Sequence, residues 1–158
     1  MRLLDILLAV AAAFIIQTVF GRYIPFLNQS VDLFTVVTAA FGLTRGRMPG
    51  LVTGSIGGLI QDAFSGGLLG LNGLAKTSVG YLAGLAQQHL IIPGATGRVL
   101  FFIAASLTDL LILAVVGYAA EVPTVIGEGL APLTVCIGNA LAGLLLIRMM
   151  EKKKLADL

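Results

Sequence analysis

The near-continuous apolar character of this chain is the feature that most restricts what it can fold into. Of its 158 residues, 58% are hydrophobic and 11% are charged, whereas a soluble domain carries roughly 25% charged residues. So few polar side chains cannot coat a surface that faces water, and lipid must therefore be the solvent. Because the apolar runs occupy nearly the whole chain, we predict a single integral membrane domain over residues 1–158.

Six apolar segments are candidates for membrane spans. A hydrocarbon core of roughly 30 Å requires about 20 helical residues. The first segment is longer than the apolar core of a signal peptide and is interpreted as a retained helix. The second and third are the weakest, because the second is free of strongly polar residues only from Leu33 to Thr44 and the third is rich in glycine. We predict an all-α bundle of about six transmembrane helices, at 3–20, 28–44, 49–65, 72–92, 98–120 and 130–148.

The distribution of basic residues predicts the orientation of these helices. With six spans and the N-terminus inside, eight basic residues fall on the cytoplasmic side and only Arg22 falls outside, while Lys76 lies within a predicted span. The positive-inside rule therefore predicts that both termini are cytoplasmic. We expect the protein to lie in the inner membrane of a bacterial cell. The eight residues are Arg2, Arg45, Arg47, Arg98, Arg148, Lys152, Lys153 and Lys154.

Small residues repeat every four positions in several of the predicted helices. Such a spacing forms a flat stripe that lets two helix backbones approach closely in lipid. Ala9 and Ala13 in segment 3–20 form a similar pair, which can face either the bundle or a partner. The glycine stripes predict a tightly packed central hairpin and consist of Gly50, Gly54 and Gly58 in one helix and Gly80 and Gly84 in the next.

Asp62 and Lys76 are ionisable residues at equal distances from Leu69, near the middle of the turn between these two helices. An ionisable side chain in hydrocarbon costs at least about 2.5–3.5 kcal/mol, so each one needs a reason. In an antiparallel hairpin, equal distances from the turn mean similar depths. We predict that the two side chains pair, either as a structural ion pair or as part of a contact with a ligand or partner.

Asp109 and Asn139 form a second predicted pair, deeper in the membrane. Asp109 lies about 16 Å along its helix from Arg98, and Asn139 lies about 13 Å from Arg148. A carboxylate at this depth must be protonated or well hydrogen-bonded. The pair is interpreted as a hydrogen bond between helices, with proton-coupled transport as the alternative.

The turn between the third and fourth predicted helices is apolar, because it contains Leu68, Leu69 and Leu71. These side chains should enter the membrane surface or be covered by another protein. Catalytic patterns are missing: His89 is the sole histidine, Cys136 is the sole cysteine, and no glycine-rich loop precedes a Lys-Ser/Thr pair. We therefore expect no enzyme activity, no cofactor, no metal and no nucleic-acid partner.

The middle of the chain contains three motifs: Gly57-Gly58-Leu59-Ile60-Gln61-Asp62, Leu69-Gly70-Leu71-Asn72 and Val79-Gly80-Tyr81-Leu82-Ala83-Gly84. These motifs resemble the family of the rod shape-determining protein MreD. That family shows a Gly-x-x-Gln-Asp segment, a Leu-Gly-Leu-Asn turn and a Gly-Tyr/Phe-Leu helix at this spacing, and the match is most specific over about residues 50–85. Asp32-Leu33 is also similar to the family's Pro-Asp-Leu, with Val31 in place of the proline.

The resemblance implies a non-catalytic scaffold subunit of the bacterial cell-elongation machinery. Its expected partners are an MreC-like membrane protein, the MreB filament, and the RodA and penicillin-binding synthases that build sidewall peptidoglycan. It also implies the fold of the substrate-binding subunits of energy-coupling-factor transporters, so a small-molecule-binding transport subunit is the alternative. The structural or partner-contact candidates are Ala9, Ala13, Gln61, Asp62, Leu68, Leu69, Gly70, Leu71, Asn72, Lys76, Asp109 and Asn139.

Overall fold

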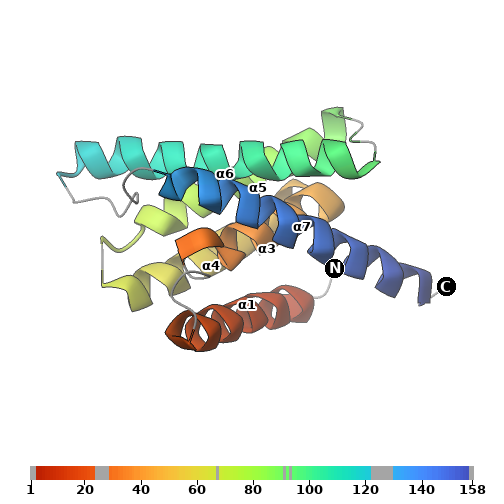
Figure 1. The fold of residues 1–158 in the computed structure, drawn as a ribbon, viewed down its shortest axis with the longest axis horizontal. Coiled ribbons are helices and arrows are strands. Elements are labelled where there is room, and N and C mark those ends of the chain that lie inside the picture. Colours follow the sequence, from red (N-terminus) through yellow and green to blue (C-terminus); the bar gives the residue numbers. More distant parts are fainter. Residues whose placement is uncertain are drawn as a thin grey trace.

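The computed structural model describes residues 3–23, 29–66, 68–90, 92, 94–121 and 130–156, and these consist of helices and short connections (Figure 1). No strand occurs in these ranges, which confirms the predicted all-α class. The long helices are α1 (Leu3–Tyr23), α3 (Leu33–Arg45), α4 (Arg47–Ser65), α5 (Leu71–His89), α6 (Gly94–Ala119) and α7 (Ala131–Ala156).

Successive long helices cross the molecule back and forth, so that their ends gather at two opposite ends of the bundle (Figure 1). At one end, Arg45 at the end of α3 pairs with Asp5 at the start of α1, at 2.9 Å. At the same end, Arg98 at the start of α6 pairs with Glu151 near the end of α7. Basic residues predicted to be cytoplasmic thus gather at one end, whereas Arg2 lies outside the described residues.

Helix α3 is the centre of the bundle, although it has only 13 residues. It packs against α1, α4, α5, α6 and α7, and every residue from Phe34 to Gly42 is buried. At about 1.5 Å per residue its length is about 20 Å, which is less than the thickness of a hydrocarbon core. One of the two weakest predicted spans is therefore the helix with the most neighbours in the bundle.

The predicted start of this helix at residue 28 is wrong. Helix α3 begins at Leu33, because the Asp32 side chain accepts the backbone N–H groups of Phe34 and Thr35 and acts as an N-cap. Residue 28 itself lies outside the described residues. These two hydrogen bonds fix the Asp32 carboxylate at the N-terminus of α3.

The glycine stripes bring α4 and α5 into backbone contact, as predicted. A Cβ atom added at Gly54 would lie 2.2 Å from the carbonyl oxygen of Lys76, and one added at Gly80 would lie 2.1 Å from that of Gly50. These neighbours are backbone atoms, which cannot rotate away as a side chain can. Glycine is therefore required at these positions by the close approach of the two helices.

Three of the described helices are long and apolar enough to cross a membrane: α1, α6 and residues Ala131–Lys152 of α7. Helix α3 is apolar but short. Helices α4 and α5 have 19 residues each and contain many glycine and polar side chains. Length and composition therefore support a membrane protein and identify three of the six predicted spans.

Candidate functional site: a buried polar cluster

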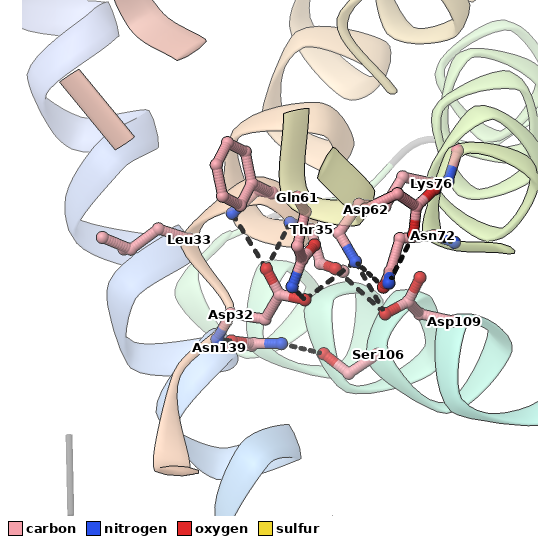
Figure 2. A network of polar contacts seen from close by, with 12 residues as sticks. Asp32, Leu33, Thr35, Gln61, Asp62, Asn72, Lys76, Ser106, Asp109 and Asn139 are labelled. Carbon is pink, nitrogen blue, oxygen red and sulfur yellow. Dashed lines mark hydrogen bonds and ion pairs between the residues drawn. The ribbon is translucent and has the colours of Figure 1, made fainter. Parts of the chain in front are cut away.

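A cluster of polar side chains lies inside the bundle, and Lys76 of α5 is at its centre (Figure 2). The Lys76 side chain is fully buried. Its Nζ lies 2.8 Å from Asp32 Oδ2, 3.3 Å from Asn72 Oδ1 and 3.5 Å from Asp109 Oδ2. An ammonium group has three N–H donors, and each of them has an acceptor here.

Asp32 accepts hydrogen bonds on both carboxylate oxygens. Its Oδ1 accepts from the backbone N–H groups of Phe34, at 3.0 Å, and Thr35, at 3.2 Å. Its Oδ2 accepts from Lys76 Nζ and from Gln61 Nε2, the latter at 3.5 Å. Asp32 therefore belongs both to the cap of α3 and to the buried ion pair.

Asp109 of α6 is only 4% exposed, and only one of its two carboxyl oxygens has hydrogen-bond partners in the described residues. Its Oδ2 accepts from the Thr35 hydroxyl at 3.1 Å and from Lys76 Nζ. No donor of the described residues lies within hydrogen-bond distance of its Oδ1. The two oxygens of one carboxyl group thus have very different surroundings.

Asn139 connects α7 to the cluster. Its Oδ1 accepts the Asp32 backbone N–H at 2.8 Å, and its Nδ2 donates to Ser106 Oγ on α6 at 3.0 Å. The neighbouring Gly138 allows this contact, because a Cβ atom there would lie 2.0 Å from the Ser30 carbonyl oxygen. Side chains from α4, α5, α6 and α7 therefore converge on the first turn of α3.

Asp62 fixes the loop between α4 and α5. Its buried carboxylate accepts the backbone N–H groups of Gly70 at 2.9 Å, Asn72 at 3.0 Å and Gly73 at 3.0 Å. It also accepts from the Asn72 side-chain amide at 2.9 Å. These donors lie at the start of α5, where unpaired N–H groups and the helix dipole favour an anion.

The predicted ion pair between Asp62 and Lys76 is wrong. Asp62 binds the N-terminus of α5, whereas Lys76 lies farther along that helix and pairs with Asp32 and Asp109. Asn72 links the two, because its amide group donates to Asp62 and accepts from Lys76. Equal distance from the turn did place them in one network, but not in direct contact.

The predicted hydrogen bond between Asp109 and Asn139 is also wrong in its direct form. Asp109 binds Thr35 and Lys76, whereas Asn139 binds Ser106 and the Asp32 backbone. The two residues belong to one cluster because the first turn of α3 contacts both. The two residues do lie at a similar level of the bundle, because Asn139 bonds Ser106, one turn from Asp109, but the helix between them was not foreseen.

Asp32, Thr35 and Ser106 were not recognised from the sequence as cluster residues. An Asp immediately before an apolar run is a typical N-cap, and this signal marks both the start of α3 and a half-buried carboxylate. Ser106 precedes Asp109 by three residues, so the two share a helix face. Gln61, one of the candidates named from the sequence, contributes the link from α4.

Of the two small residues of α1, Ala13 faces the bundle rather than a partner. Ala13 is 3% exposed and packs in an apolar cluster with Phe34 and Phe41 of α3, and the half-buried Ala9 packs against the same cluster. Of the apolar turn, Leu68 and Leu69 are exposed and Leu71 is half-buried. The loop leucines thus remain candidates for a contact, whereas Ala13 does not.

The described residues contain no group of three or more His, Cys, Asp or Glu side chains placed to hold a metal ion. Cys136 is buried in α7, and His89 is exposed at the end of α5. Comparisons with protein-family models, with curated proteins and with solved structures find no match to this chain. The function must therefore be inferred from the contacts described above and from the motif resemblance.

Proposed function

We propose that this protein is a non-catalytic membrane scaffold subunit that holds an MreC-like partner in the bacterial cell-elongation machinery. The observation that carries the proposal is the loop before α5, which exposes Leu68 and Leu69 and whose end is held by Asp62, because Asp62 accepts four hydrogen bonds from Gly70 and from the first turn of α5. The identity of the machinery comes from the motif resemblance, which also suggests the MreB filament and the RodA and penicillin-binding synthases as further partners.

A fixed apolar loop is suited to binding because little conformational entropy remains to be lost. Leu69 is 72% exposed and Leu68 is 43% exposed, and both lie directly before the Gly70 N–H group that Asp62 accepts. Ordering a mobile loop on association reduces affinity, and a loop that is already ordered avoids that loss. Such a loop offers a rigid apolar contact to another protein.

We infer that this loop lies on the outer side of the inner membrane, and the position of the basic residues supports this orientation. The ion pairs Asp5–Arg45 and Arg98–Glu151 lie at the opposite, basic end, which the positive-inside rule assigns to the cytoplasm. A partner with one span and a periplasmic domain could then contact both the loop and the lipid-facing helices. A cysteine at position 69 should be labelled from the periplasm and one at Lys152 from the cytoplasm; labelling of both from one side would contradict the orientation.

The partner contact can be tested with Leu69→Ser, because Leu130→Ser offers a matched control. Both leucines are 72% exposed, but Leu130 lies at the start of α7, outside the fixed loop. Burying a leucine contributes about 1.5–3 kcal/mol, so Leu69→Ser should reduce recovery of the partner about tenfold or more. The measurement is co-purification from native membranes in gentle detergent, with the thermal unfolding of both variants compared with the wild type.

Equal recovery with Leu69→Ser and Leu130→Ser would contradict the loop contact. If no chain co-purifies with the wild type, the scaffold function itself is refuted. A strain that depends on this protein should also lose rod shape with Leu69→Ser and retain it with Leu130→Ser.

A small-molecule-binding subunit of a membrane transporter is a second candidate. The observation in its favour is the buried cluster around Lys76, because ionisable residues inside membranes often mark substrate or ion pathways. The close backbone packing of α4 and α5 favours the scaffold instead. Co-purification of a stoichiometric small molecule or of an ATPase pair would favour the transporter.

A further inference from the structure

We propose that the buried cluster is a proton-binding site, with one proton held by the Asp109 carboxyl group at neutral pH. The proposal does not depend on the scaffold function. It rests on the hydrogen-bond partners of three side chains, Lys76, Asp32 and Asp109, which together decide the charge of the cluster.

Lys76 is present as an ammonium ion. A neutral amine has two N–H donors and one lone pair, whereas an ammonium has three donors and no acceptor. Every polar neighbour of Nζ is an oxygen: Asp32 Oδ2, Asn72 Oδ1 and Asp109 Oδ2. Three acceptors and no donor around Nζ match the charged form.

Asp32 is present as a carboxylate. Four donors point at its two oxygens, namely two backbone N–H groups, the Lys76 ammonium and the Gln61 amide. A proton on either oxygen would displace one of these hydrogen bonds. Asp32 and Lys76 at 2.8 Å therefore form a neutral pair, and this pair already balances the only ammonium within ion-pair distance of the cluster in the described residues.

An ionised Asp109 would leave the cluster with a net charge of −1 inside the membrane, where an uncompensated charge is strongly unfavourable. Its Oδ1 would also be half of a carboxylate without a donor from the described residues. A protonated Asp109 removes both problems. The proton lies on Oδ1, the oxygen that has no donor, and Oδ2 continues to accept from the Thr35 hydroxyl, 3.1 Å away, and from Lys76 Nζ.

The neighbours of Asp109 on each packed helix agree with this assignment. Helix α3 presents Asp32 and Thr35, α5 presents Lys76, and α7 presents the uncharged Asn139, which reaches α6 through Ser106. The Asp62 carboxylate on α4 is occupied by the N-terminus of α5. A monovalent metal ion in place of the proton would be repelled by the ammonium that lies 3.5 Å from the same carboxyl oxygen.

Infrared spectroscopy of the full chain in lipid nanodiscs tests the proposal directly, because a protonated carboxyl group has its own carbonyl stretching band, which shifts in heavy water. At neutral pH the wild type should show this band. Asp109→Asn should abolish it. Asp62→Asn, which changes a buried carboxylate outside the cluster's charge balance, should leave it unchanged.

Two further variants test the charge balance itself. In Asp32→Asn the ammonium pairs with Asp109 alone, so Asp109 ionises and the band disappears. In Lys76→Met no ammonium remains, so both carboxyl groups are neutral and the band roughly doubles. Asp109→Asn mimics the protonated side chain and should retain the wild-type unfolding temperature, whereas Asp32→Asn should lower it.

Absence of the band from the wild type at neutral pH would overturn the proposal, as would a band that persists in Asp109→Asn. Stabilisation of the wild type by sodium or potassium, without the band, would show a metal ion at the site instead. A further expected result concerns pH. Because the folded chain holds a proton that the unfolded chain has released, the wild-type unfolding temperature should fall as the pH rises from neutral, and Asp109→Asn should lack that part of the fall.

Discussion

The three inner helices of the bundle differ from the three outer ones in almost every property used to recognise membrane helices. Helices α3, α4 and α5 have 13, 19 and 19 residues and contain the glycine stripes and Lys76. Helices α1, α6 and α7 have 21, 26 and 26 residues and expose many large apolar side chains. The outer helices are recognised by hydropathy, and the inner ones are not.

The difference shows that hydropathy measures contact with lipid rather than centrality in the fold. In lipid, an apolar side chain gains little by leaving the solvent, so the interior is built by close backbone approach and by satisfied polar groups. Gly54 and Gly80 allow the close backbone approach, and Asp32 and Lys76 are polar groups that satisfy one another. Four substitutions can break or sharpen this contrast, and they follow in order of expected effect.

Lys76→Met should have the largest effect on stability. It leaves the Asp32 and Asp109 carboxyl groups buried without their cation, and breaking a buried ion pair typically costs about 3–5 kcal/mol. The measurement is unfolding of the purified protein in detergent, with Lys152→Met, an exposed charge at the end of α7, as the control. The double variant with Asp32→Asn should cost less than the sum of the single changes; strict additivity would contradict the pair.

Gly54→Ala should come next. The added Cβ would meet the Lys76 carbonyl oxygen at 2.2 Å and force α4 and α5 apart, at a cost near the upper part of the range of about 1–3 kcal/mol for overpacking. Gly57→Ala on the same helix is the matched control, because its Cβ would meet only the Phe34 side chain, at 3.1 Å. Equal losses of unfolding free energy for the two variants would show that backbone contact is not what joins these helices.

Asn139→Ala should have an intermediate effect, although the residue belongs to an outer helix. The change removes the acceptor for the Asp32 N–H and the donor to Ser106, and leaving such buried groups unpaired costs about 1–3 kcal/mol. Amide hydrogen exchange at the first turn of α3 should increase more than exchange at its last turn. Uniform acceleration along α3 would instead indicate a general loss of packing.

Leu111→Ala should have the smallest effect. Its side chain is 63% exposed on α6, and changes at such positions usually alter the free energy of unfolding by no more than about 0.5 kcal/mol. The same unfolding assay in detergent provides the measurement. A loss above about 1 kcal/mol would reveal that this face of α6 is a packed interface rather than a lipid-facing surface, and would move one helix from the outer group to the inner one.

The sequence was sufficient to predict the structural features that depend only on neighbouring residues in the chain. Apolar runs predicted the helical class, and the spacing of Gly50, Gly54 and Gly58 predicted close packing against the next helix, because spacing on one helix defines a face. The exposed loop leucines were also found in advance, since Leu68 and Leu69 lie in a turn. These features require no knowledge of which distant helices are neighbours.

The partners of the buried charges could not be predicted in the same way. Asp32 and Asn139 are 107 residues apart, and nothing in either segment indicates that α3 lies beside α7. For Asp62 and Lys76, equal distance from the turn did not give equal depth, because Lys76 lies level with Gly54 of α4 whereas Asp62 bonds the N-terminus of α5. The N-cap signal at Asp32 and the spacing of Ser106 and Asp109 were the local signals of the cluster that were not used.

The order of the cluster residues along the chain has a consequence for synthesis in the cell. Asp32 enters the membrane before Lys76, so the carboxylate that neutralises the ammonium is already in place when α5 arrives. Asp109 follows, and α7 then brings Asn139, whose Oδ1 accepts the Asp32 N–H. A nascent chain that stops before α7 thus has its ion pair but an unpaired backbone N–H at the start of α3, and α7 supplies the missing acceptor.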